Sequence, residues 1–127
     1  MSTFFAPHLF IKNVKAGMEF YKNAFEAIDL RKWSNADGSV HVAEMAIDGV
    51  MFHLHEEVNS SNQLSPETVN ATTSSIGLFV ANPDSLVKSA VVAGARVLNP
   101  IQDFEYGYRQ GVVIDPFGHH WLIQKKI

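Results

Sequence analysis

The stretch SIGLFVANP (residues 75–83) has the same pattern as PHLFIKN (residues 7–13), and this repetition decides the fold. When the chain is shifted against itself by 69 positions, identical residues meet: Leu9 and Leu78, Phe10 and Phe79, and Asn13 and Asn82. Each apolar run predicts a buried strand. Each asparagine is of the type that accepts hydrogen bonds from the first N–H groups of a helix. The chain therefore contains an internal repeat of a strand followed by a helix.

Helix signals follow both asparagines. After the first, one apolar stripe continues at helical spacing through Val14, Met18, Tyr21 and Phe25. After the second, Pro83 occupies the first helical position, and Gly94 stands where a left-handed cap ends a helix.

Three strand-like segments follow each predicted helix. They cover residues 27–33, 39–47 and 50–56, then 96–103, 107–114 and 119–126, with turns at Asp48-Gly49 and Pro116-Phe117-Gly118. The sequence predicts a single α+β domain, residues 1–127, in which two βαβββ modules (1–56 and 74–127) flank a polar linker (57–73) and form a mixed-sheet cup. The alternative is one α+β sheet without duplication.

Composition excludes several classes of function. The chain has no cysteine, which excludes disulfides and thiolate chemistry and fits a reducing compartment. A net charge of −3 supplies no basic stripe, so we expect no nucleic-acid partner. The N-terminus lacks a signal-peptide pattern, and no apolar run approaches the roughly 20 residues that span a bilayer. We therefore expect a cytoplasmic protein without a membrane partner.

The C-terminal run YGYRQGVVIDPFGHHW (residues 106–121) resembles the closing segment of the vicinal oxygen chelate superfamily, the glyoxalase/bleomycin-resistance/dioxygenase proteins. Its DPFGH-x-W form is similar to the PhnB-like branch. LFIKNV with Phe20-Tyr21, and HVAE (41–44) before Asp48-Gly49, resemble the family's first helix and hairpin. This resemblance implies the duplicated fold, a homodimer, and a ligand-binding cup.

Enzymes of this family hold a divalent metal with one residue from the first and one from the last strand of each module. At the repeat offset, those positions are Ala6, His53, Ser75 and Leu122. Ala6 and Leu122 have no donor atom, and metals need imidazole or carboxylate ligands. The sequence thus predicts no cofactor and no stoichiometric nickel, zinc or iron. A divalent metal recruited by other cup histidines is the less favoured alternative, because the HLH spacing of His53 and His55 does not itself supply a third ligand.

Other residues are candidates for contact with a ligand. Side chains alternate along a strand, and the resemblance implies which strands line the cup. The candidate ligand-binding residues are His8, Phe10, His53, His55, Phe79, Tyr106, Arg109, His120 and Gln124. The repeat offset equates Glu44 with Val113 and Val40 with Arg109, so Glu44 and Arg109 are expected to face the cup. For Arg109 the alternative is a structural ion pair between neighbouring strands.

Two functions remain open at this point. The first is a small-molecule binder without the usual metal centre, whose ligand the sequence does not name. The second is a lyase, isomerase or dioxygenase that uses an atypical metal set, or metal-free acid–base catalysis by His53 and Glu44. The sheet edges and apolar faces of such modules also predict a homodimer.

Overall fold

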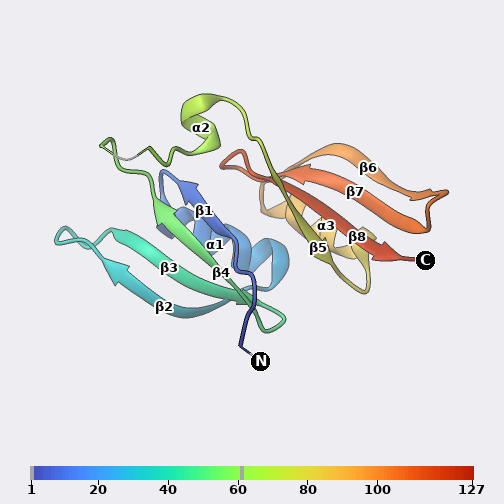
Figure 1. The fold of residues 1–127 in the computed structure, drawn as a ribbon, viewed down its shortest axis with the longest axis horizontal. Coiled ribbons are helices and arrows are strands. Elements are labelled where there is room, and N and C mark those ends of the chain that lie inside the picture. Colours follow the sequence, from blue (N-terminus) through green and yellow to red (C-terminus); the bar gives the residue numbers. More distant parts are fainter. Residues whose placement is uncertain (1, 61) are drawn as a thin grey trace.

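The computed structural model describes residues 2–60 and 62–127 (Figure 1). The first half contains β1 (His8–Ile11), α1 (Val14–Phe25), β2 (Ile28–Ser34), β3 (Val40–Ile47) and β4 (Val50–Glu56). The second half contains β5 (Ser75–Phe79), α3 (Pro83–Ala93), β6 (Arg96–Phe104), β7 (Tyr108–Ile114) and β8 (His120–Lys126). Each half forms one four-stranded sheet, and the strand orders β1-β4-β3-β2 and β5-β8-β7-β6 are equivalent. In each sheet the first strand in the chain pairs in parallel with the last, β1 with β4 and β5 with β8. The prediction of two βαβββ modules is confirmed.

The predicted caps begin both long helices. The Asn13 side chain accepts a hydrogen bond from the Ala16 N–H, and the Asn82 side chain accepts one from the Ser85 N–H. Gly94 ends α3 with a φ of 125°, as its position predicts. At the matching end of α1, Glu26 adopts the left-handed conformation although it is not glycine.

The polar segment between the modules contains a short helix that the sequence analysis did not predict, α2 (Pro66–Val69). Ser65 accepts a hydrogen bond from the Thr68 N–H, and Pro66 stands at the start of the helix. The Glu57 carboxylate accepts hydrogen bonds from the Ser65 N–H and the Thr68 hydroxyl. Ser-Pro-Glu is a helix-start signal in the sequence, so α2 could have been recognised.

Both sheets turn one face towards a shared core. Tyr21 of α1 is fully buried, and its ring lies 5.5 Å from the ring of Phe52 in the first sheet and 5.5 Å from that of Trp121 in the second. Phe52 and Trp121 are both buried, at 3% and 2% exposure. The opposite faces of the two sheets, called the outer faces below, therefore point away from the core. Within one chain they do not close around a common cup, which corrects that part of the prediction (Figure 1).

A buried carboxylate connects the two modules. Asp115, 3% exposed, precedes the β7–β8 turn and accepts hydrogen bonds from Tyr21 of α1 and from the Trp121 indole. Its other oxygen accepts from the backbone N–H groups of Phe117 and His119. Burial, followed by the adjacent Asp115, raises the pKa of Tyr21 well above its usual value, so the phenol remains a hydrogen-bond donor.

We expect Asp115→Ala to lower the free energy of unfolding by about 3–5 kcal/mol, because it leaves buried donors without an acceptor. Tyr21→Phe removes one of these donors and should cost about 1–2 kcal/mol. Urea denaturation of both variants measures the difference. A smaller loss for Asp115→Ala than for Tyr21→Phe would contradict the proposed role of the carboxylate.

Candidate functional site

The outer face of the first sheet carries three histidines, His8, His53 and His55, which we call the histidine cluster. His8 of β1 is the register partner of His53 in the parallel strand β4. His55 lies two residues further along β4 and therefore projects from the same face. The buried residues Leu9 and Leu54 alternate with them and face the core.

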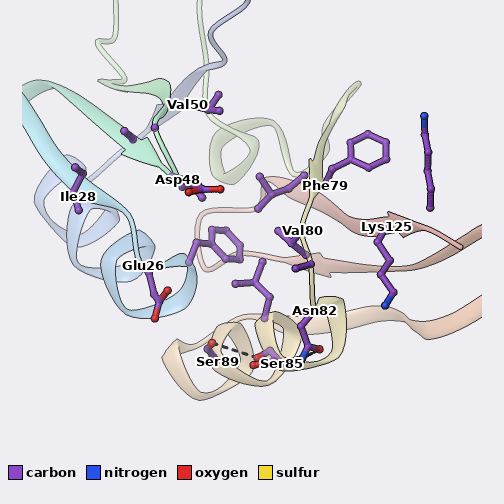
Figure 2. A pocket seen from close by; sticks show the side chains of 18 residues that line it. Glu26, Ile28, Asp48, Val50, Phe79, Val80, Asn82, Ser85, Ser89 and Lys125 are labelled. Atoms are coloured by element: carbon purple, nitrogen blue, oxygen red, sulfur yellow. Dashed lines mark hydrogen bonds between the residues drawn. The ribbon is translucent and has the colours of Figure 1, made fainter.

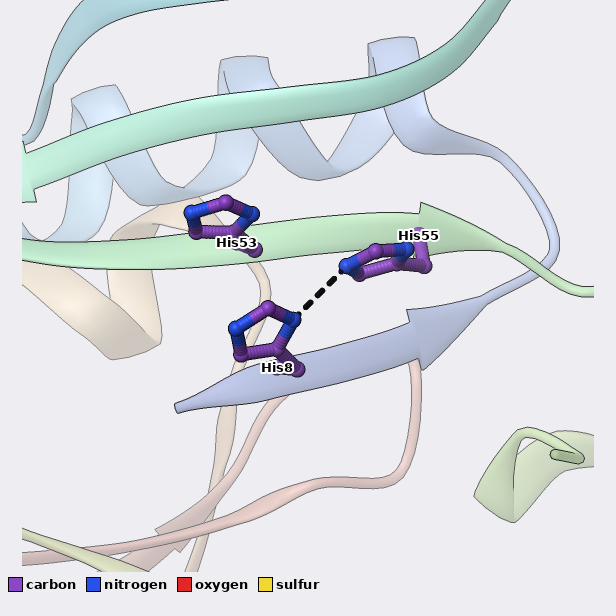
Figure 3. A group of neighbouring side chains, drawn as sticks. All are labelled: His8, His53 and His55. Carbon is purple, nitrogen blue, oxygen red and sulfur yellow. Dashed lines mark hydrogen bonds between the residues drawn. The ribbon is translucent and has the colours of Figure 1, made fainter. Parts of the chain in front are cut away.

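The three imidazoles of the histidine cluster are in direct contact (Figure 3). The rings of His8 and His53 stack with centroids 4.3 Å apart, and those of His8 and His55 with centroids 5.0 Å apart. His8 Nδ1 and His55 Nε2 are 2.8 Å apart and share a hydrogen bond. One ligating nitrogen from each ring lies within 4.8 Å of the others.

The environment favours the neutral form of two of these rings. Burial, followed by the charge of His53, lowers the pKa of His8. Burial, followed by repulsion from His8, His53 and His41, lowers the pKa of His55. At neutral pH each of these two rings therefore retains one unprotonated nitrogen that accepts a hydrogen bond or binds an ion.

Glu44 of β3 adds a carboxylate beside the histidine cluster. It is the register partner of His53, and its Oε2 lies 3.5 Å from His53 Nε2. Both side chains are partly buried, at 22% and 15% exposure. Glu44 and His53, which the sequence predicts as an acid–base pair, are therefore adjacent. Phe10 stacks on His55, with ring centroids 5.0 Å apart.

The four positions of a glyoxalase-type metal centre do not come together within this chain. His53 lies in the first sheet, whereas Ser75 and Leu122 lie in the second, in β5 and β8. Leu122 is paired with Gly77 and Val112. Of the four, Ala6 and Leu122 bring no donor atom.

The outer face of the second sheet carries an aromatic group, here called the aromatic face. Phe79 and Tyr106 are 56% and 62% exposed. The Tyr108 ring lies 6.0 Å from Phe79 and 5.7 Å from Tyr106. Phe104, which the sequence analysis missed, stacks on Tyr106 at 5.2 Å. Such rings provide flat apolar surface together with hydroxyl groups.

Two further candidates lie beside the aromatic face, in β8. Gln124 is buried and pairs in register with Phe79, and a side chain on Gly77 would collide with its amide nitrogen, at 2.9 Å. His120 is partly buried opposite Ser75. His120 therefore lies in a different sheet from the histidine cluster.

Arg109 lies on the core-side face of the second sheet, so the prediction that it faces the cup is wrong. Its guanidinium binds the Asp84 carboxylate of α3 at 2.8 and 2.9 Å and Asp103 of β6 at 2.9 Å. These hydrogen bonds lower the pKa of Asp84. The alternative prediction for Arg109, a structural ion pair, agrees with its contacts to Asp84 and Asp103.

The error has a simple geometric cause. Phe52 and Trp121 are 69 positions apart, as the repeat requires, but their strand partners Met45 and Val113 are 68 positions apart. The chain therefore has one more residue between Val113 and Trp121 than between Met45 and Phe52. The extra residue lies in the β7–β8 turn, which has Pro116-Phe117-Gly118 where the first module has Asp48-Gly49. Val112, and not Val113, is therefore the counterpart of Glu44.

A cleft of about 920 Å³ lies between the modules (Figure 2), and no residue of the histidine cluster lines it. The end of α1 and the β3–β4 turn form one side, including Glu26 and Asp48. The end of β5 and the start of α3 form the other, including Phe79 and Asn82, with Lys125 at the margin. Of the candidate ligand-binding residues, Phe79 lines it.

Comparison with known proteins identifies the family. Residues 4–123 match the model of the Glyoxalase/Bleomycin resistance protein/Dioxygenase superfamily. The chain belongs to this superfamily. It is 32% identical over 125 residues to an uncharacterized protein of Mycobacterium bovis, covering 96% of this chain and 82% of that protein.

Solved structures share the fold of this superfamily member. An Arabidopsis thaliana gene product has a TM-score of 0.73 and 27% identity, with 97% of this chain and 98% of that chain covered. The PhnB protein of Bacillus cereus has a TM-score of 0.71 and 15% identity, with coverage of 97% and 99%. In the part of the chain that the structure describes, no helix is long and apolar enough to cross a membrane.

We expect Arg109→Gln to lower the melting temperature slightly at pH 7, because two carboxylates lose their partner. The stabilisation from a carboxylate with a lowered pKa is present above its usual pKa, 3.8 for Asp84, and is lost as the pH falls through the lowered value. The difference between wild type and variant should therefore narrow below about pH 4. Thermal unfolding followed by circular dichroism from pH 3 to 8 measures it, and a difference that grows on acidification would refute the assignment.

Proposed function

We propose that this chain binds a small molecule on the outer faces of its two sheets, without the usual four-ligand metal centre of the superfamily. The observation that carries the proposal is the chemistry of these faces. One presents the histidine cluster with Glu44, and the other presents the aromatic face with Gln124. Imidazole, carboxylate and aromatic groups with a few directed polar atoms are what small-molecule sites use.

We further propose that a second copy of the chain completes the site. The outer faces are open to solvent in one chain, and so is β2, with Ile28 59% and Leu30 49% exposed. In a twofold dimer, the same patches cover each other reciprocally. The histidine cluster of one copy would then oppose the aromatic face of the other, which gives two equivalent cups.

An enzymatic function is the second candidate, and the contact between Glu44 and His53 favours it. A carboxylate beside an imidazole is a common general-base arrangement. In this version, His53 moves a proton on a bound substrate and Glu44 orients the ring, in a lyase, isomerase or dioxygenase type of reaction.

We also propose that the chain belongs to the PhnB-like branch, which the DPFGH-x-W segment supports. A cytoplasmic location is a further proposal.

We expect a dimer at micromolar concentration in sedimentation-equilibrium experiments, because the exposed sheet faces then become buried. Leu30→Lys, on the exposed strand β2, provides a test of the contact surface and should shift the equilibrium towards monomer. A wild-type chain that sediments as a monomer at all concentrations would contradict the composite cup.

We expect a thermal-shift screen of small molecules to find compounds that raise the melting temperature. A ligand at 100 times its dissociation constant stabilises by about 2.7 kcal/mol. Tyr106→Ala should abolish the shift of such a compound, since the ring is exposed on the aromatic face, while Arg109→Gln on the other face should retain it. A shift that both variants preserve would place the ligand elsewhere, and the cleft of Figure 2 would be the next surface to test.

A further inference from the structure

We propose that His8, His53 and His55 bind one divalent late first-row transition-metal ion, such as Zn²⁺, with the three imidazoles of a single module as its ligands. The observation is the convergence of one nitrogen atom from each ring within 4.8 Å of the others. Binding of the ion by these three imidazoles does not require a small molecule in the cup. A negative result in the small-molecule screen therefore leaves the metal site untouched, and the reverse also holds.

Strand pairing produces this convergence. His53 and His55 project from the same face because they are two residues apart in β4. His8 joins them because β1 runs parallel to β4 and pairs His8 with His53. Neighbouring strands lie about 4.8 Å apart, which brings the third ring into reach. The sequence alone predicts that His53 and His55 share a face, but it does not show that His8 lies beside them.

The nitrogen atoms are close enough to share one ion after rotation of the side chains. Zinc–nitrogen bonds of about 2.0–2.1 Å in a tetrahedral site place ligand atoms about 3.3–3.4 Å apart. His8 Nδ1 and His55 Nε2 are already 2.8 Å apart. The rings are stacked, with interplanar angles of 22°, 26° and 16°, so the side chains must rotate before their in-plane lone pairs meet at one point. His8 is exposed and has room to do so.

Ligand type determines which ions fit. Three imidazoles favour Zn²⁺, Co²⁺, Ni²⁺ or Cu²⁺, whereas Mg²⁺ and Ca²⁺ prefer oxygen ligands. Glu44, 3.5 Å from His53 Nε2, is placed to orient that ring, as carboxylates do for metal-bound histidines. The open outer face leaves a fourth coordination position accessible to water.

This site differs from the four-position centre of the family. The two share His53 alone, and the new site draws no ligand from the second module. His8, at the start of β1, lies two residues after Ala6 in the chain. The inference also departs from the sequence-based expectation of a metal-free protein, because that expectation lacked the third imidazole that strand pairing provides.

The test uses the untagged full-length protein, since a histidine tag would bind the same ions. After treatment with a chelator and dialysis, the protein is titrated with Zn²⁺ in a calorimeter and with Co²⁺ in a spectrophotometer. We expect one Zn²⁺ per chain, visible absorption bands of Co²⁺ bound by nitrogen ligands, and no heat from Mg²⁺. His8→Gln and His55→Gln should each weaken Zn²⁺ binding at least about tenfold.

His41→Gln is the matched control. His41 is an imidazole of the same sheet, in β3, but it lies outside the histidine cluster and contacts Glu56 at 3.2 Å. Its substitution should change Zn²⁺ affinity much less than His8→Gln or His55→Gln does. Circular dichroism and melting curves check that each variant is folded, and the Co²⁺ spectrum of the wild type tests the site without any substitution.

Three results would overturn the proposal. They are the absence of Zn²⁺ and Co²⁺ binding, a loss of affinity in the His41→Gln control as large as that in the His8→Gln and His55→Gln variants, and Zn²⁺ binding that both His8→Gln and His55→Gln leave unchanged. The last result would place the ion outside the histidine cluster.

Discussion

The arrangement of both modules depends on the Asp115 carboxylate. Its two oxygens receive hydrogen bonds from a helix of the first module, an indole of the second sheet and the backbone of the turn between β7 and β8. A carboxyl side chain at 3% exposure is unfavourable unless its oxygen atoms are hydrogen-bonded. Because this carboxylate is satisfied only when α1 packs on Trp121, the same contact sets the direction in which both outer faces point.

The fold could be predicted in detail because its signals are local. Asn13 and Asn82 mark helix starts, and runs of apolar residues mark strands. The glyoxalase-type family model agrees with that reading over residues 4–123. The direction of the outer faces could not be predicted, because it depends on the packing of Tyr21 against the second sheet. The left-handed Glu26 also lacks a signal, since glycine is the usual residue there.

The candidate site was predictable in its residue types and less so in its geometry. His53 and His55 share a face by alternation alone, but their contact with His8 requires the parallel register of β1 and β4. Arg109 was misplaced because an ungapped repeat was extended across a turn in which one module has an additional residue. Tyr108 and Phe104 meet through strand pairing between β6 and β7, which composition does not reveal.

The additional residue in the second hairpin determines which residues of the two modules correspond. Since side chains alternate along a strand, one extra residue in a turn changes which positions of two repeated strands correspond, and an ungapped comparison then assigns each residue to the wrong face. In β7 the corrected correspondence assigns Val112 to the outer face and Arg109 to the core side, where Asp84 binds it. The outer face of the second module therefore has Val112 at the position where the first module has Glu44, and Arg109 on the opposite face of β7 braces α3 through Asp84.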